Sequence, residues 1–483
     1  MTSFFGSLRE EWFSNIRGDT LSGLVVALAL IPEAIAFSII AGVDPKVGLY
    51  ASFCIAVVIS FVGGRPGMIS AATGAMALVM VDLVAEHGLQ YLLAATLLCG
   101  VIQIIMGILK LGNLMRFVSR SVVIGFVNAL AILIFVAQLP ELSQMNYWGY
   151  AFVALGLAVI YLFPYLPKLG KTIPSPLICI LVLTALALFL DTDMRMVSDL
   201  GHFPDTLPIF LLPDIPLTLE TLQIVFPYAI TLATVGLLET MMTTTVVNEV
   251  TGTEGDRHQE CRGQGMANIV SGFMGGMAGC AMIGQSVINV SSGARTRLST
   301  LVAGVFLLCL VVFFKDWLSY IPMAALVAIM IMVAFTTFQW DSVKNFSKHP
   351  LQSNVVMLSV VMIVLATHNL ALGVFVGVLL SALFFINKLE STVHVQSELH
   401  NHTRRYLVSG QIFFSSSEKF FQFFDFNEHI QKVEIELSNA HIWDMTSVQM
   451  LNAVVEKFEV QGVVVEVLGL NEASSTLIDR ISS

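Results

Sequence analysis

The sequence predicts a polytopic α-helical membrane protein followed by a small α/β domain. Hydrophobic residues make up 56% of the 483 residues, charged residues only 12%, and the mean hydropathy is +0.82. Soluble domains carry about 25% charged residues. Apolar runs long enough to span the ~30 Å hydrocarbon layer recur between residues 20 and 388, and charged, alternating sequence follows them.

We expect fourteen membrane segments and therefore both chain ends on the same side. With the N-terminus placed in the cytoplasm, the inner loops contain fourteen Lys and Arg residues and the outer loops three. The positive-inside rule favours this orientation in the inner (plasma) membrane. The segment centres lie near Ala27, Cys54, Leu78, Cys99, Ala129, Gly156, Leu183, Ala233, Ile269, Val287, Phe306, Ala328, Met362 and Leu380.

The composition also divides the chain and excludes several classes of function. We expect an N-terminal cytoplasmic segment at 1–19, a transporter domain at 20–388, a linker at 389–403 and a soluble domain at 404–483. The net charge of -10 implies no nucleic-acid partner. The six cysteines form no C-x-x-C pattern, so neither disulfides nor a metal site is indicated. No phosphate-binding loop for an ATP-driven pump occurs.

Two interrupted segments give the strongest functional signal. "GGRPGMISAATGAMALV" begins at Gly63, and "GGMAGCAMIGQSVINVS" begins at Gly275. They fall in the third and tenth segments, seven apart, so two seven-segment halves would cross the membrane in opposite senses. Such inverted repeats are common in secondary transporters, and paired Gly/Pro-interrupted segments point to the substrate site.

The interruptions predict two half-helices whose N-termini face each other at the membrane midplane. Their first N–H groups have no partner within the helix and carry a partial positive charge, so together they favour an anion. Thr73, Gln285 and Ser286 could add side-chain donors. The alternative is close helix packing through small residues.

Two carboxylates lie deep in apolar segments, Glu33 in the first and Glu239 in the eighth. Charges there are costly and usually face a polar interior. Each could bind a proton, or Glu239 could coordinate Na⁺ with Thr243, one helical turn later. A structural carboxylate is the alternative, and Phe37 could wall the same cavity or simply pack.

The C-terminal region predicts alternating strands and helices. "RYLVSGQIFFS" and "KVEIELSN" alternate as strands do, and "SVQMLNAVVEKFEVQG" has helical spacing and stops at Gly462. "VVVEVLGL" indicates a buried strand, and "EASSTLIDRIS" indicates a last helix. We expect Ser447 to cap the helix that follows it.

The stretches "IPEAIAFSIIAGVDPKVGLYAS", "ISAATGAMALV", "GLLET" and "VSSGARTRLS" resemble the sulfate permease (SulP) family of anion transporters. "ELSNAHIWDMTSVQML" and "VVVEVLGL" resemble its STAS domain. Thr446 and Ser447 fall where signalling relatives of this domain are phosphorylated, but we favour the helix cap for Ser447. The resemblance implies fourteen segments in two inverted repeats of seven, with UraA-like core and gate subdomains, an elevator-like motion and a homodimer.

The resemblance also implies the site. The anion would lie between the starts of the third and tenth segments, and the family positions fall on Phe37, Thr73, Gly74, Ala75, Gly284, Gln285 and Ser286. Glu33 stands where many members have Gln. Glu239 and Thr243 resemble the positions of the cation ligands in sodium-coupled bicarbonate members, and Glu239 replaces the Asp of those members, which favours a proton.

We therefore expect a proton-coupled anion symporter rather than an enzyme, with no cofactor besides the co-transported H⁺ or Na⁺. Sulfate, bicarbonate and dicarboxylates all fit a site made of backbone amides. Na⁺-coupled bicarbonate uptake, a nucleobase transporter of the same fold, an anion channel and a non-transporting sensor are the alternatives.

Overall fold

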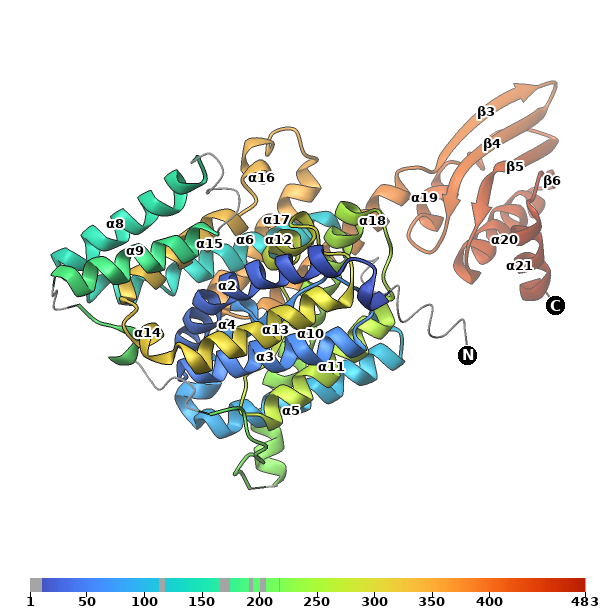
Figure 1. Cartoon of the computed structure of the whole chain (residues 1–483). Helices are drawn as coiled ribbons and strands as arrows, with labels where there is room; N and C mark the ends of the chain where they lie inside the picture. Colours follow the sequence, from blue (N-terminus) through green and yellow to red (C-terminus); the bar gives the residue numbers. More distant parts are fainter. Residues whose placement is uncertain are drawn as a thin grey trace. The chain divides into compact units, whose positions relative to one another are not determined.

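The structure is a computed structural model that describes residues 11–112, 118–165, 174–190, 194–199, 206–216 and 218–482. It divides into two compact units at Gly377 and Val378 (Figure 1). The first unit is helical and the second contains a four-stranded sheet.

Each of the fourteen predicted segment centres lies in a separate helix. In chain order these helices are α2 (Ile16–Ile40), α3 (Pro45–Val62), α4 (Gly74–His87), α5 (Leu89–Ile108), α6 (Arg120–Val136), α8 (Tyr147–Leu162), α9 (Ser175–Leu190), α10 (Leu219–Thr251), α11 (Arg257–Phe273), α12 (Ile283–Ser291), α13 (Arg297–Phe313), α15 (Met323–Thr337), α17 (Leu351–Thr367) and α18 (Leu370–Glu390). Within the described residues, seven helical stretches are long and apolar enough to cross a membrane, and four shorter apolar helices accompany them. The count of fourteen crossings stays a prediction.

The same order of elements occurs twice in the first unit. Helices α2 and α3 are followed by strand β1 (Ser70–Ala72), α4 and α5; helices α10 and α11 are followed by strand β2 (Gly279–Ala281), α12 and α13. The two strands pair antiparallel, with Ala71 opposite Cys280. The interruptions that the sequence predicts are therefore real breaks between helices, and each contains a short strand.

Small residues allow the helices around these breaks to approach closely. A Cβ atom added to Gly100 of α5 would lie 2.5 Å from the carbonyl oxygen of Gly265 in α11. A Cβ atom added to Gly265 would likewise lie 2.5 Å from the carbonyl oxygen of Gly100. A Cβ on Gly23 of α2 would lie 2.6 Å from the carbonyl oxygen of Ser299 in α13. Figure 1 shows α2, α13 and α3 running alongside one another. This is the close packing through small residues that is typical of membrane helices.

Two fully buried carboxylates fix the loops near the breaks. Oε2 of Glu260 accepts the N–H groups of Gly64 at 2.7 Å and Arg65 at 3.0 Å. Oδ1 of Asp19 accepts the N–H groups of Arg295 at 2.7 Å and Thr296 at 3.0 Å, where α13 begins. Charge-assisted bonds of this kind are stronger than neutral ones, so both loops are held in place.

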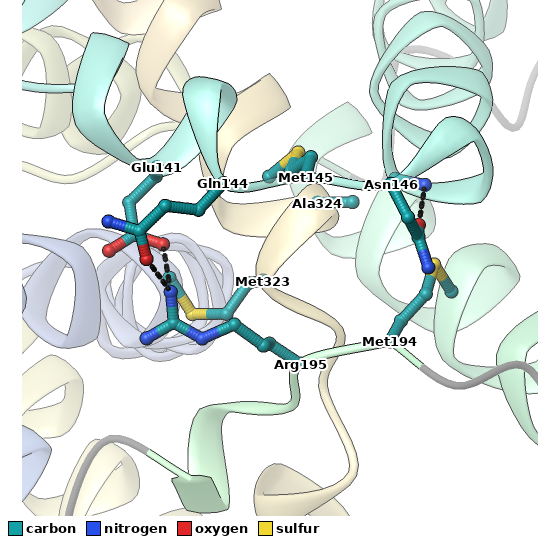
Figure 2. A pocket seen from close by; sticks show the side chains of 9 residues that line it. Glu141, Gln144, Met145, Asn146, Met194, Arg195, Met323 and Ala324 are labelled. Carbon is teal, nitrogen blue, oxygen red and sulfur yellow. Dashed lines mark hydrogen bonds and ion pairs between the residues drawn. The ribbon is translucent and has the colours of Figure 1, made fainter.

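Residues 194–199 connect to the beginning of α15. The N–H of Met323 donates to the carbonyl oxygen of Arg195 at 3.0 Å. The Arg195 guanidinium in turn contacts Glu141 Oε2 at 3.1 Å and Gln144 Oε1 at 3.0 Å (Figure 2). Glu141 belongs to α7 (Leu139–Ser143), so this cluster joins α7, residues 194–199 and the start of α15. Two further short helices, α14 (Lys315–Ser319) and α16 (Trp340–Lys344), flank α15 in the chain.

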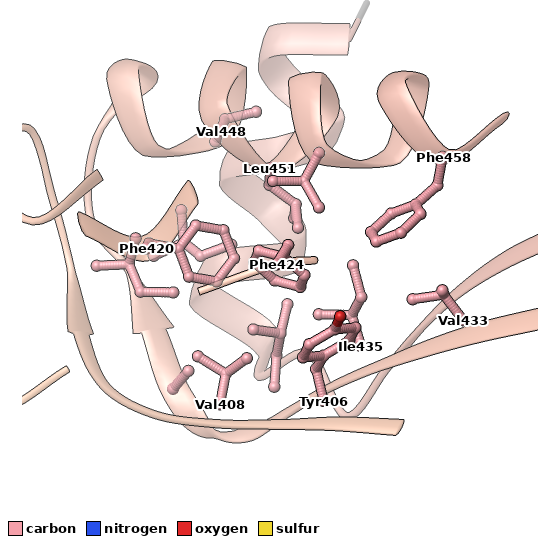
Figure 3. Close-up of a cluster of buried hydrophobic side chains, with 14 of the residues drawn as sticks. Tyr406, Val408, Phe420, Phe424, Val433, Ile435, Val448, Leu451 and Phe458 are labelled. Atoms are coloured by element: carbon pink, nitrogen blue, oxygen red, sulfur yellow. The ribbon is translucent and has the colours of Figure 1, made fainter. Parts of the chain in front are cut away.

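The second unit is an α/β domain with strand order β3-β4-β5-β6. Its elements are β3 (His394–His400), β4 (Thr403–Ile412), α19 (Ser417–Gln422), β5 (Lys432–Ile442), α20 (Met445–Glu459), β6 (Val464–Leu468) and α21 (Glu472–Ser482). Strands β4, β5 and β6 are parallel, as the predicted crossover through α20 requires. Tyr406, Phe420, Phe424 and Phe458 gather in the core between sheet and helices (Figure 3).

Three details of this domain differ from the sequence predictions. Strand β6 was predicted to be buried, which is wrong: it pairs only with β5, and Val464 is 63% exposed. The range 389–403, predicted as a linker, contains β3, which pairs with β4 along its whole length. The N-cap of α20 is Asp444 rather than the predicted Ser447, which is buried in the first turn and completes a capping box with Asp444; Thr446 is exposed.

Candidate functional site

A cavity of about 570 Å³ lies where both breaks meet the surrounding helices. Its wall combines the starts of α4 and α12 with parts of α2, α6, α9, α10 and α15. The predicted residues that line it are Glu33, Phe37, Thr73, Gly74, Ala75, Glu239, Gly284 and Gln285.

The first half of the site is the start of α4. Thr73 is the N-cap, and its Oγ1 accepts the N–H of Met76 at 3.4 Å. Gly74 and Ala75 follow in the first turn and line the cavity. A Cβ on Gly74 would lie 2.9 Å from Cε1 of Phe37, so glycine lets the aromatic ring approach the helix start.

The second half is the start of α12. Its N-cap, Met282, has no side chain that could accept a hydrogen bond from the first turn. A Cβ on Gly284 would meet nothing within 4 Å, because this position faces open space. Nε2 of Gln285 donates to Oε1 of Glu33 at 2.6 Å, which joins α12 to α2. Ser286 does not line the cavity: its hydroxyl accepts the N–H of Ile69 at 3.0 Å and thereby anchors α12 to the chain before β1.

The β1–β2 ladder sets the relative direction of the two helix starts. Because the strands are antiparallel and each leads directly into its helix, α4 and α12 begin near opposite ends of a three-residue ladder and run apart. Their N-termini therefore face the same space. The N–H groups of Gly74, Ala75, Ile283 and Gly284 belong to first turns and have no partner within their helices. Two partial positive charges of about +0.5 thus meet at this cavity.

The carboxylates contact these two helix starts. Glu33 is bound to Gln285 of α12, as described. The thiol of Cys280 donates to Oε2 of Glu239 at 2.9 Å, and its sulfur lies 3.1 Å from Oγ1 of Thr73, the cap of α4. Thr243 is fully buried and outside the cavity wall, and its hydroxyl contacts two carbonyl oxygens, that of Glu239 at 2.8 Å and that of Ala281 at 3.3 Å. Among the described residues that line the cavity there is no Lys or Arg.

Comparison with known proteins decides the family. The model of the "Sulfate permease family" matches residues 16–154 and 148–361, and that of the "STAS domain" matches residues 394–482. The chain belongs to the sulfate permease family. This is a family of anion transporters rather than enzymes, and the chain is accordingly a multi-pass membrane protein with a C-terminal STAS domain.

Several sulfate permease relatives are similar over most of the chain. A Bacillus subtilis protein named "Putative sulfate transporter YbaR" is 54% identical over 99% of both chains. The "Bicarbonate transporter BicA" of a Picosynechococcus strain is 28% identical, over 80% of this chain and 72% of its own. In fold, the murine Solute Carrier 26 family member A9 anion transporter in the inward-facing state matches with a TM-score of 0.83 at 17% identity, covering 97% of this chain and 88% of its own.

The structure of this sulfate permease family member brings together most, but not all, of the predicted site residues. Eight line one cavity, while Ser286 and Thr243 support its walls from behind. Sequence reasoning missed Cys280, which connects Glu239 to Thr73. Its place in β2, directly opposite Ala71, follows from the pairing of the two breaks. An alignment of the two interrupted stretches as paired strands could have indicated it.

Proposed function

We propose that the chain is a secondary active transporter that takes up a small anion, sulfate in the first instance, together with protons. The observation that carries the proposal is one cavity holding two helix N-termini and two carboxylates but, among the described lining residues, no basic side chain. The names of the relatives, a sulfate transporter and a bicarbonate transporter, support the class of substrate.

The charge balance of the cavity favours symport. At an effective dielectric constant of 20, an ionised carboxylate about 8 Å from the anion raises its free energy by roughly 2 kcal/mol per unit charge. When Glu33 and Glu239 are both ionised, each of the two carboxylates repels both charges of a dianion such as sulfate. The binding free energy of sulfate is then less favourable by roughly four times that amount. Neutralising the carboxylates with protons removes this repulsion and leaves the helix termini to bind the anion.

A proton is favoured over Na⁺ as the coupling ion. A Na⁺ site at Glu239 would use the Thr243 hydroxyl as an oxygen ligand. That hydroxyl lies against the carbonyl oxygens of Glu239 and Ala281, outside the cavity wall. Na⁺-coupled bicarbonate uptake is the second candidate, because of the similarity to the bicarbonate transporter.

Two cavities along α2, one lined by Glu33 and Phe37 and the other by Ile39 and Ile40, support an alternating-access motion. The site cavity reaches the ends of α9 and α15 at Pro174, Ser175 and Thr337, which the proposed topology places inside. A second cavity of about 440 Å³ lies between the outer ends of α2, α4 and α6, and Asp82 and Gln138 line it. We propose that α2, α4 and α12 belong to a core that moves against a gate containing α6 and α15, as in an elevator.

The remaining architecture is part of the same proposal. The recurring order of elements and the antiparallel β1–β2 pair support two inverted repeats of seven segments. We propose fourteen spans across residues 20–388 in the inner membrane, cytoplasmic 1–19 and 404–483 regions, and a homodimer. Cysteine accessibility from each side tests the orientation, and light scattering of the detergent-solubilised protein tests the dimer.

The decisive experiment is uptake into proteoliposomes containing the purified full-length chain. Sulfate, bicarbonate, fumarate and uracil are offered with and without inward pH and Na⁺ gradients. We expect concentrative sulfate uptake that requires the pH gradient and is insensitive to Na⁺. Uptake driven only by Na⁺ would establish the second candidate, and uptake of uracil instead of anions would reject an anion site.

A further inference from the structure

We propose that Cys280 is a positioning residue that couples the protonation of Glu239 to the anion-binding hydroxyl of Thr73. This inference rests on the proposed function and deepens it, because it states how a proton on one side chain changes the affinity of the site for the anion.

The three side chains form a continuous contact. The Cys280 sulfur lies 2.9 Å from Oε2 of Glu239 and 3.1 Å from Oγ1 of Thr73. Cys280 is fully buried and Thr73 is 2% exposed, whereas Glu239 is partly exposed and lines the cavity. The thiol is held in place by its backbone, since Cys280 pairs with Ala71 in the ladder and the next N–H, of Ala281, donates to Oγ1 of Thr240 at 3.3 Å.

The number of hydrogens on each group decides which atom donates in each of these contacts. A thiol and a hydroxyl each have one hydrogen to donate. When Glu239 is ionised it can only accept, so the Cys280 S–H points to it. The Thr73 O–H then points to the Cys280 sulfur or to the Glu239 carboxylate, with which it also interacts, and in either case it is withheld from the cavity.

Protonation of Glu239 reverses this order. The carboxylic acid O–H donates to the Cys280 sulfur, and the Cys280 S–H turns to Oγ1 of Thr73. The Thr73 O–H is then free to donate into the cavity, where the anion lies beside Gly74 and Ala75. No proton leaves its own oxygen or sulfur in this step; only the O–H and S–H bonds rotate.

Other titratable groups lie near α10 but do not contact the Glu239 carboxylate. On the elements that pack against α10 they are Tyr91 and Cys99 (α5), Asp82, Glu86 and His87 (α4), and Arg257, His258, Glu260, Cys261 and Arg262 (α11); α10 itself carries Glu220, Tyr228 and Glu249, and Glu33 on α2 faces the same cavity. Among the described side-chain hydrogen bonds, Cys280 alone of these titratable groups reaches Glu239.

The test compares Cys280→Ala with the matched control Cys280→Ser, which keeps one donor and one acceptor. The assay is the KM for sulfate in proteoliposomes of the full-length chain, measured at acidic and at mildly alkaline pH. For wild type and Cys280→Ser we expect KM to rise about tenfold or more with pH, the size of one hydrogen bond to a charged group. Repulsion between the ionised carboxylates and sulfate raises KM with pH in every variant, so the hydrogen bond is measured as a difference: for Cys280→Ala we expect a rise about tenfold smaller than that of wild type.

A Cys280→Ala variant whose KM rises with pH as steeply as that of wild type would overturn the proposal. Should that variant fail to reconstitute, Thr73→Val gives the same decision, because its KM should also rise about tenfold less with pH than that of wild type. A rise as steep as that of wild type refutes the coupling. Failure of the proposed function is distinguishable, since wild type itself would then show no sulfate uptake or no dependence on pH.

Discussion

Replacing Gln285 by Glu tests the electrostatic basis of the site without changing the size of the side chain. Gln285 is 5% exposed at the start of α12, and its amide donates to Glu33 at 2.6 Å. The substitution removes that donor and places a second carboxylate against the first. Two ionised carboxylates about 4 Å apart repel by roughly 4 kcal/mol at an effective dielectric constant of 20, so the pair will hold a proton up to a higher pH.

The effect on the anion follows from the same relation. Above the pH at which the pair loses its proton, the added charge about 8 Å from the anion costs roughly 2 kcal/mol for bicarbonate and roughly 4 kcal/mol for sulfate. These values correspond to about a 30-fold and about a thousandfold increase in KM, since 1.4 kcal/mol is a factor of ten.

The assay is proteoliposome uptake of both anions over a range of pH, with Gln285→Met as the control. Met removes the hydrogen bond without adding charge, so we expect it to weaken both anions alike and by about tenfold at most. An unchanged KM for sulfate in Gln285→Glu at alkaline pH would refute the placement of the anion at the start of α12. Equal losses for sulfate and bicarbonate would refute the charge argument.

Two further predictions concern packing and the STAS domain. Gly74→Ala places a methyl group 2.9 Å from the Phe37 ring, so we expect this variant to lose about 1–3 kcal/mol of stability in thermal unfolding. Gly284→Ala places its methyl group in open space, so we expect this variant to lower only the affinity for sulfate. Partial burial raises the pKa of Asp444, but hydrogen bonds from Ser447 outweigh it and hold the pKa below its usual value. Asp444→Ala should therefore cost about 1 kcal/mol at neutral pH, and the loss should shrink below about pH 4, as hydrogen exchange of α20 can measure.

The sequence predicted those features that depend on long or repeated patterns. Each segment centre falls in its own helix, and seven helical stretches within the described residues are apolar runs of membrane length, the clearest signal in a sequence. The crossover from β5 through α20 to β6 follows from clear periodicity. Glu33 and Glu239 could be singled out because a carboxylate is rare in such runs. Both carboxylates line one cavity, and their part in coupling stays a prediction.

The sequence could not predict what depends on short or partner-determined contacts. Strands β1 and β2 have three residues each, too few to show alternation, and they exist only because they pair with each other. Cys280 looks like any buried cysteine until that pairing places it between Thr73 and Glu239. Strand β3 packs only Val395 against the core and exposes its other residues, so it lacks the apolar alternation that marks a strand.

The β1–β2 ladder also has a consequence for biosynthesis. Thr73 and Cys280 are separated by 207 residues, so β1 leaves the ribosome long before the strand that completes it. At a synthesis rate of roughly 5–20 residues per second, about 10–40 s pass before β2 is made. Until then the peptide groups of β1 have no partner strand in the bilayer. During that interval the nascent chain needs a substitute partner, such as an insertase or water, and truncation before residue 279 should leave a product that the cell degrades.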